Sequence, residues 1–309
     1  MNRRYFIKNI GTGAVLLGAN GFPLEALAAL PSEMVKLTIL HTNDVHSRID
    51  PFPMDGTSNQ GLGGVAKRAA LIKKIRTQEK NILLLDAGDI FQGTPYFNFY
   101  NGEIEMKLMS EMGYDAATIG NHDFDAGMDN LALQLKNATF PLVNANYDFS
   151  NTVMKSHVQP YKIFKKQGIK IGVFGVGIEL KGLVQKSLYK ETVYNDPLSM
   201  ANKTATFLKQ EEKCDYVICL SHLGYKYKDS KIDDVKLATH SHHIDLIIGG
   251  HTHTFLDKPD ILKNVDNQPV IVNQVGWAGI MLGRIDVFFE RTKQAKCESC
   301  QNIYVGKQD

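Results

Sequence analysis

The sequence predicts an α/β fold with a mainly parallel sheet that helices cover on both faces. Short continuous apolar runs alternate with longer amphipathic stretches, as expected for strands that are buried on both faces and joined by helices. Several of these runs end in Asp, Asn or His, and ligands of such sheets bind at the carboxyl ends of the strands. The runs 161–165 and 169–176 flank Gly168 and predict one antiparallel hairpin.

The predicted elements follow in a regular order along the chain. In the helix expected at 61–80, apolar residues recur at helical spacing and basic residues occupy the other face. Segment 51–60 is rich in Pro, Gly, Ser and Asn and is expected to be a loop, as is the Gly- and Pro-containing segment 90–95. The other expected helices are 103–112, 128–137, 198–213 and 231–243. The expected strands are 35–40, 81–86, 115–119, 142–146, 161–165, 169–176, 216–220, 244–248, 270–275 and 281–290.

Residues 1–28 have the composition of an export signal. The paired Arg3 and Arg4 precede a mildly hydrophobic Gly/Ala/Leu stretch, and Ala26-Leu27-Ala28 offers a small-residue cleavage site. This pattern is typical of a bacterial twin-arginine signal and predicts a periplasmic or otherwise extracytoplasmic protein. An ordinary amphipathic helix is the alternative. No stretch reaches the roughly 20 apolar residues of a membrane span, so none is expected after signal cleavage.

The charge balance argues against nucleic acid as a partner. The chain has 35 Lys and Arg against 33 Asp and Glu, and the leader contributes Arg3, Arg4 and Lys8 against Glu25. Residues 29–309 are therefore electrically balanced, which gives no electrostatic reason to expect nucleic-acid binding. Because this part shows no internal repeat and no low-complexity linker, we expect it to form a single domain.

The four cysteines receive no chemical role. Cys219 lies in an apolar run and is expected in the core, and Cys214 lies nearby. Cys297 and Cys300 could close a small loop or supply half of a zinc site, and disulfides persist outside the cytoplasm. No second cysteine pair of similar spacing exists, which argues against a structural zinc ion. The pairing of Cys297 with Cys300 stays open.

Side chains of metal-ligand type follow five of the predicted strands. The spacing Asp44-x-His46 recurs as His251-x-His253, and on an extended turn the two residues of each pair can point at one ion. A carboxylate such as Asp89 can bridge two ions. Because strand ends converge, the sequence predicts a site for two divalent ions, with one zinc site or scattered core histidines as alternatives. The candidate ligands are Asp44, His46, Asp89, Asn121, His222, His251 and His253.

Other residues near these motifs allow two interpretations. His41 either supports the site or is a satisfied core histidine. The aromatic residues within 91–100 either pack in the core or form a hydrophobic wall for a substrate ring, and the loop 51–60 could border the cleft. Three histidines near the end of the helix at 231–243 suit the helix dipole and are expected at the surface: His240, His242 and His243.

These motifs resemble those of a known family. Asp44-x-His46, Gly88-Asp89, Gly120-Asn121-His122-Asp123, His222 and Gly250-His251-x-His253 resemble the calcineurin-like metallophosphoesterase signature. The flanking stretches 40–46, 88–95 and 120–125 resemble the bacterial 5'-nucleotidase branch, and the resemblance covers essentially the whole chain after the leader. It implies a four-layer α/β/β/α sandwich and a metal-dependent phosphoric ester hydrolase.

The resemblance also implies a role for each residue. One divalent ion would bind Asp44, His46, Asp89 and His253, and the other Asp89, Asn121, His222 and His251, with attack on phosphorus by a hydroxide shared between them. His122 would stabilise the transition state and could protonate the leaving group, and Asp125 would orient it. The choice among Zn, Mn, Co, Fe and Ca stays open.

The sequence departs from this branch in two respects. Many nucleotidases have Gln where this chain has His253, which leaves metal binding intact but could change metal preference. Nucleotidases of this branch usually carry a second, C-terminal domain that grips the nucleotide, and we find only the catalytic part. A nucleoside 5'-monophosphate is the favoured substrate. The alternatives are a phosphodiesterase or nucleotide-sugar hydrolase, or a catalytic subunit that needs a separate nucleotide-binding partner protein.

Overall fold

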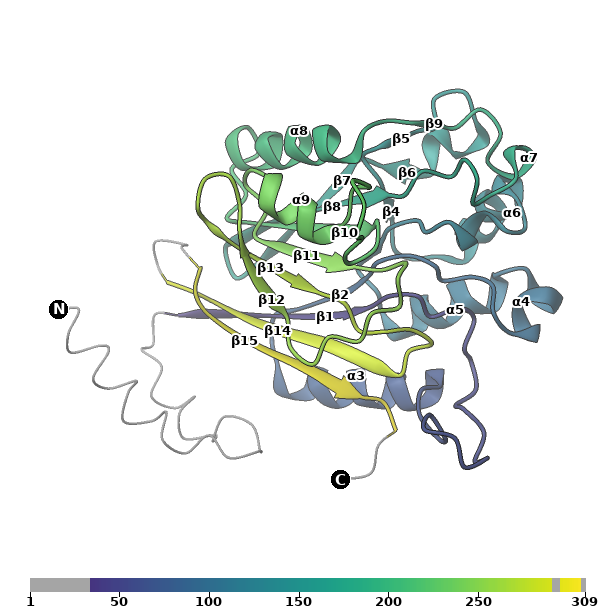
Figure 1. Cartoon of the computed structure of the whole chain (residues 1–309). Helices are drawn as coiled ribbons and strands as arrows, with labels where there is room; N and C mark the ends of the chain where they lie inside the picture. Colours follow the sequence, from purple (N-terminus) through teal and green to yellow (C-terminus); the bar gives the residue numbers. More distant parts are fainter. Residues whose placement is uncertain (1–33, 291–294, 307–309) are drawn as a thin grey trace, which may run out of the picture.

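The computed structural model describes residues 34–290 and 295–306, with the backbone alone at 296–298. Two β-sheets lie face to face, and helices cover the outer face of each (Figure 1). The predicted α/β/β/α sandwich is therefore confirmed. The leader at 1–28 lies outside the described residues. None of the helices in the described part of the chain has the length and hydropathy of a membrane span.

The first sheet is parallel in its centre and antiparallel at one edge. Strands β1, β2, β3, β4 and β6 run parallel, whereas β14 is antiparallel to β1, and β15 to β14. Within the described residues its order is β15 (Ala295–Tyr304), β14 (Met281–Phe289), β1 (Val35–Thr42), β2 (Ile82–Asp86), β3 (Ala116–Ala117), β4 (Leu142–Val143) and β6 (Val158–Gln159).

The second sheet has four parallel strands between two antiparallel edges. The predicted hairpin is confirmed, because β7 pairs antiparallel with β8. Within the described residues the order is β12 (Asp260–Lys263), β13 (Pro269–Asn273), β11 (Leu246–Gly249), β10 (Tyr216–His222), β8 (Ile169–Gly177) and β7 (Tyr161–Lys166). A separate small ribbon pairs β5 (Tyr147–Asp148) with β9 (Val193–Tyr194).

The helices pack on both outer faces, and two of them, α8 and α9, start at side-chain caps. At α8, Asp196 accepts a hydrogen bond from the backbone N–H of Ser199 and Pro197 occupies the first turn; at α9, Asp233 caps Lys236 in the same way. The α-helices are α3 (Val65–Gln78), α4 (Pro95–Tyr100), α5 (Glu103–Met112), α6 (Met128–Gln134), α7 (Lys186–Tyr189), α8 (Pro197–Gln210) and α9 (Asp234–His240). The 3-10 helices are η2 (His122–Phe124), η3 (Leu135–Asn137) and η4 (Val153–Ser156).

Alternation along the strands builds three apolar layers. In β2, Leu83 and Leu85 face the core between the sheets, while Leu84 packs with α3 and α5. In β10, Ile218 faces the same central core and Val217 packs with α8 and α9. Successive side chains of a strand point to opposite faces, so a continuous apolar run is what a strand buried on both faces requires. This core fixes where the strands end, and the candidate site lies at those ends.

The structure corrects several predicted elements. The strand expected at 115–119 is only two residues long, although the backbone N–H groups of Asp115 and Thr118 still donate to β2, and the chain then turns into the site. The tight loop expected at 90–95 leads directly into α4, with Pro95 at the first helical position. Strands β12 and β15 lack an apolar run and were not predicted. Cys297 and Cys300 lie on the extended β15 and not in a loop.

Candidate metal centre

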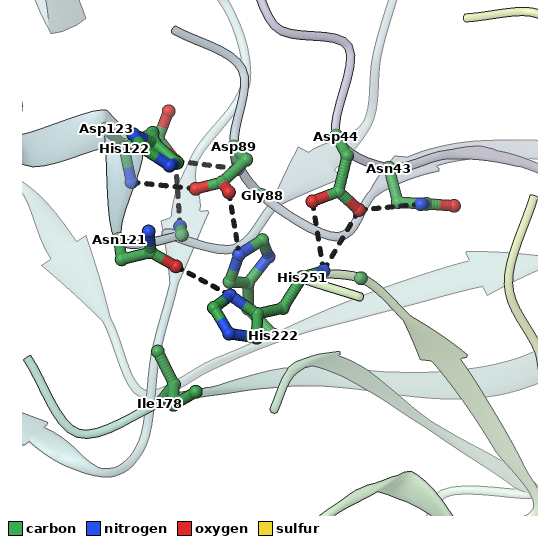
Figure 2. A network of polar contacts seen from close by, with 12 residues as sticks. Asn43, Asp44, Gly88, Asp89, Asn121, His122, Asp123, Ile178, His222 and His251 are labelled. Carbon is green, nitrogen blue, oxygen red and sulfur yellow. Dashed lines mark hydrogen bonds and ion pairs between the residues drawn. The ribbon is translucent and has the colours of Figure 1, made fainter. Parts of the chain in front are cut away.

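The carboxyl ends of strands from both sheets meet at one place, and all seven predicted ligands lie there. Figure 2 shows Asp44, Asp89, Asn121, His222 and His251 close together. The loop after β1 carries Asp44 and His46, the loop after β2 carries Asp89, and the turn after β3 carries Asn121. From the second sheet, His222 is the last residue of β10, and the turn after β11 carries His251 and His253.

The ligand atoms form two groups. Asp89, His222 and His251, here the inner group, offer atoms within 4.8 Å of one another, and so do Asp44, His46 and His253, here the outer group. Asn121 adjoins the inner group, because its Oδ1 lies 2.8 Å from Nδ1 of His251. The structure therefore brings the predicted residues together in the two sets that the family resemblance implied, apart from the shared position of Asp89.

The Asp89 carboxylate lies between the two groups. Its Oδ2 is 3.1 Å from Nε2 of His222 in the inner group and 3.8 Å from Nε2 of His46 in the outer group. Its Oδ1 accepts a hydrogen bond of 2.8 Å from the backbone N–H of His122. Asp89 is 1% exposed, so its position is fixed by these neighbours. This is the geometry that a bridging carboxylate needs.

The backbone at the site is strained at five of the seven positions. Asp44, His46, Asp89, His251 and His253 have positive φ angles between 49° and 75°. Non-glycine residues seldom adopt this left-handed conformation, at a cost of about 1–3 kcal/mol each, and such residues cluster at functional sites. The strain indicates that the surrounding structure holds these side chains in place for a purpose other than stability.

Two glycines allow the loops to approach one another. A Cβ at Gly120 would lie 2.1 Å from Oδ1 of Asp89, and one at Gly250 would lie 2.9 Å from Nδ1 of His222. Both distances are shorter than real Cβ contacts, so any side chain there would push the ligand loops apart. The glycines of the sequence motifs are therefore explained by close packing around Asp89 and His222.

Buried amide and carboxylate side chains hold the ligand loops, and the sequence assigned them no role. Asp123 accepts hydrogen bonds from the backbone N–H groups of Asp89 and Gly120, which ties two loops together. Asn43 donates to Asp44 at 2.7 Å and to the carbonyl of Gly276 at 2.6 Å. Gln274 donates to the carbonyl of Gly250 at 2.7 Å, at the start of the turn with His251 and His253. Such groups orient ligands, but only the folded structure shows which loops they join.

Charge in the inner group is balanced by histidine. Burial disfavours a charged His222, but the facing Asp89 outweighs burial and raises the pKa of His222 to about 10. Burial likewise opposes charge on Asp89, and the facing imidazoles, chiefly His222, bring the pKa of Asp89 below its usual range. Burial lowers the pKa of His251 to about 4 and also lowers that of His46, so both rings are neutral. Asp89 thus favours positive charge at His222, whereas His46 and His251 offer neutral imidazoles.

These residues fit divalent ions. Nε2 of His222 is buried without a well-directed hydrogen bond, although Oδ2 of Asp89 is 3.1 Å away. In the outer group, the Nε2 atoms of His46 and His253 face one another at 3.0 Å, with Oδ1 of Asp44 3.4 Å from His253. Imidazole nitrogens and carboxylate oxygens that converge in this way are ligands for borderline divalent metals.

His122 and Asp125 form a pair beside both groups. Nδ1 of His122 donates to Oδ2 of Asp125 at 2.7 Å, and this hydrogen bond is the main reason that the pKa of His122 is raised. The His122 ring packs edge-on against His46, with ring centroids 5.3 Å apart. The His122 side chain is 39% exposed, so it remains accessible to solvent. It belongs to neither group of ligand atoms in the described residues.

The structure decides between the interpretations that the sequence left open. His41 is a core histidine, because it is fully buried with Nε2 2.8 Å from Nδ2 of Asn273, and burial lowers its pKa to about 3. The aromatic residues at 91–100 split, since Phe91 and Phe97 are core residues whereas Phe99 is 78% exposed. Loop 51–60 does reach the site, because Phe52 contacts Trp277, which stacks on His253. Of the three histidines expected at the surface, His240 and His242 are exposed and His243 is half-buried, and none belongs to either group within the described residues.

The chain is similar to known phosphoesterases. Residues 37–255 match the model of the calcineurin-like phosphoesterase family. The trifunctional nucleotide phosphoesterase protein YfkN of Bacillus subtilis is 36% identical over 286 residues, which are 82% of this chain and 18% of YfkN. The 5'-nucleotidase of Vibrio cholerae is 32% identical over 316 residues, covering 94% of this chain and 55% of that protein.

A solved structure gives the same result for the fold. The crystal structure of the 5'-nucleotidase precursor from Thermus thermophilus superposes with a TM-score of 0.81 at 31% identity, over 88% of this chain and 55% of that one. This chain thus spans about half, or less, of the length of the relatives that it matches.

Proposed function

The chain belongs to the calcineurin-like phosphoesterase family, and from this premise we propose that it hydrolyses phosphate monoesters of nucleotides with two divalent ions. One ion would be held by Asp44, His46, Asp89 and His253, and the other by Asp89, Asn121, His222 and His251. The observation that carries this proposal is the position of Asp89, whose Oδ2 faces both His222 and His46. The 5'-nucleotidase names of its relatives support the nucleotide as substrate.

The residues around the ions divide the work of hydrolysis. When bound, the ions would polarise the phosphoryl group, neutralise its charge and supply the nucleophile. Asp125 holds the His122 ring through Nδ1 and favours its protonated form, so Nε2 of His122 can donate a proton to a phosphoryl oxygen or to the leaving group. The hydrogen bonds of the buried Asp123 and Asn43 hold the ligand loops in position.

Two other candidate functions have specific support, and they differ from the first in how the leaving group is recognised. A phosphodiesterase uses the same ligands, and the relative YfkN is named a trifunctional nucleotide phosphoesterase. Nucleotide recognition could also need residues beyond these 309, in a second domain or a separate protein, because the relatives are about twice as long as the matched part or longer. Fold similarity alone does not select the substrate.

The proposal is tested by hydrolysis with purified protein reconstituted with Zn²⁺, Mn²⁺ or Co²⁺. The substrates are 5'-AMP and bis-(p-nitrophenyl) phosphate, and the test variant is Asp89→Asn. The control variant is Asp266→Asn, because the exposed carboxylate of Asp266 pairs with His242. We expect AMP turnover that Asp89→Asn abolishes and Asp266→Asn preserves. Turnover of the diester alone would favour the phosphodiesterase or a missing recognition domain, and no turnover of either with metals bound would refute phosphoester hydrolysis.

Export is a separate part of the proposal. Residues 1–28 have the twin-arginine pattern, and the relative from Thermus thermophilus is named a precursor. Fractionation of cells that produce the full chain should find the protein outside the cytoplasm, and the double variant Arg3→Lys, Arg4→Lys should retain it inside. Cytoplasmic location of the unaltered chain would contradict export without affecting the proposed hydrolysis.

A further inference from the structure

We infer that Trp277 is the positioning residue that holds His253 in the outer group. The indole and imidazole rings stack almost parallel, with an interplanar angle of 8° and centroids 5.7 Å apart. This separation lies within the range of offset-stacked aromatic pairs. The inference rests on the proposed two-ion function, and it adds a residue that no ligand motif contains.

His253 has the greatest need of such support in the outer group. Its side chain is 40% exposed, against 8% for His46 and 0% for Asp44. Its ring faces His46 and Asp44, which belong to the same group and would share the same ion. Trp277 contributes a contact from outside the group. An exposed imidazole on a left-handed backbone position, with φ 51°, would otherwise lose more rotamer freedom when it binds an ion.

Trp277 is itself held by its surroundings. Phe52 packs edge-on against the indole, with centroids 5.7 Å apart and an interplanar angle of 76°. The Arg48 guanidinium lies 4.2 Å from the centroid of the Phe52 ring. Trp277 also packs against a small apolar cluster that includes Val275 and Ile280. The indole is therefore a fixed surface and not a mobile rim side chain.

The turn that carries Trp277 is joined to the ligand loops by backbone hydrogen bonds. The N–H of Ala278 donates to the carbonyl of Asp44 at 2.7 Å, and the N–H of Gly276 donates to the carbonyl of Thr254 at 2.9 Å. These bonds connect the turn to the outer ligand Asp44 and to Thr254, which follows the outer ligand His253. The position of the indole is thus set relative to the outer group, which is what a positioning role requires.

The sole tryptophan of the chain gives a direct readout. Metal-free protein is titrated with Co²⁺ while tryptophan emission and the heat of binding are followed. We expect two binding steps, with the emission change concentrated in the weaker step, because the ring stacked on Trp277 then binds the ion. His253→Ala should remove that step from both signals. An emission change that His253→Ala leaves unaltered would overturn the assignment.

Three variants separate stacking from general loosening of the turn. Trp277→Ala should weaken the lower-affinity Co²⁺ step about 10-fold, in line with the loss of other outer-shell partners, and leave the tighter step unchanged. Trp277→Phe keeps an aromatic face and should restore most of the affinity. Phe255→Ala is the matched control, since Phe255 is an exposed aromatic two residues from His253 that packs near Gly276. Circular dichroism checks that each variant is folded.

The outcomes distinguish this inference from the proposed function. Two ions bound with equal affinity by the unaltered protein and by Trp277→Ala would overturn the role of Trp277 and leave the two-ion proposal standing. Equal weakening by Trp277→Ala and Phe255→Ala would also overturn it, because the effect would then belong to the turn. Fewer than two ions in the unaltered protein would refute both.

Discussion

The inner and outer groups offer the same kinds of ligand atoms but differ in what holds them. His222 of the inner group is the last residue of β10 and is fully buried, as is Asp89 opposite it. The outer ligands lie on loops, as Asp89 and His251 of the inner group also do, but the outer His253 is 40% exposed and stacks on Trp277. A ligand on a sheet is fixed by the core of the protein, whereas a ligand on a loop depends on local contacts. We therefore expect the inner ion to bind more tightly and the outer ion to exchange.

The largest effect is expected from His222→Ala. The substitution removes an inner ligand and leaves Asp89 buried without its closest imidazole, 3.1 Å away. Phosphoester hydrolysis should fall by more than about 1,000-fold, equivalent to about 4 kcal/mol of transition-state stabilisation. In the metal-free protein, urea unfolding should report a loss of about 3 kcal/mol, as for a broken buried ion pair.

The matched variant on the outer side is His253→Ala. Because its side chain is 40% exposed, its removal should change the unfolding free energy of the metal-free protein by less than about 0.5 kcal/mol. If both variants were equally destabilised, the distinction between a core-held and a loop-held group would be wrong.

Asp125→Asn tests whether His122 acts on the substrate and not on the ions. Loss of the carboxylate weakens the 2.7 Å hydrogen bond from Nδ1 and its support of the protonated ring. The turnover number should fall about 10- to 100-fold, the range for loss of general acid catalysis or of its orienting group. Inductively coupled plasma mass spectrometry should still find both ions. Loss of an ion would assign the pair to metal binding instead.

Graded chelation measures the difference between the groups directly. Protein loaded with Zn²⁺ is equilibrated with increasing EDTA, and the ions that remain per chain are counted. We expect the outer ion to leave first, at a free Zn²⁺ concentration about 10-fold higher than the concentration at which the inner ion leaves. In His253→Ala the first step should be absent. Simultaneous release of both ions from the unaltered protein would show that Asp89 couples the groups more strongly than their scaffolds separate them.

The parts of the fold that the sequence predicted are those that the core dictates. Strands β2, β10 and β11 have uninterrupted apolar runs because both of their faces are buried. By contrast, β15 contains Glu298, Ser299 and Gln301 and pairs with β14 at the edge of its sheet. Such an edge strand is specified by backbone pairing more than by hydrophobic pattern, so its sequence carried no signal.

The candidate site likewise has a part that the sequence predicted and a part that it did not. Its ligands could be predicted because each follows a strand and each has a side chain that binds metal, as with Asp44 and His251. The groups that hold them could not. Asp123, Gln274 and Trp277 act through contacts between loops that are far apart along the chain, and no local spacing reveals such a contact. Asp123 holds the loop of Asp89 and Gln274 holds the turn of both histidines, whereas the Trp277 stack supports the outer group alone.

The smallest effect is expected from His253→Gln, which introduces the residue that the family resemblance leads us to expect at this position. The amide oxygen of Gln can replace an imidazole nitrogen as a ligand, but it is harder and cannot stack on Trp277 in the same way. We expect hydrolysis to stay within about 10-fold of the unaltered protein, with metal preference moving from Zn²⁺ towards Mn²⁺. Competition of the two ions for metal-free protein, followed by mass spectrometry of the bound metal, measures the change.

The double variant Trp277→Ala, His253→Gln tests whether the stack matters only for His253. If it does, the double variant should bind the outer ion as tightly as His253→Gln alone. A second, additive loss in the double variant would mean that Trp277 supports the outer group through the turn and not through the imidazole.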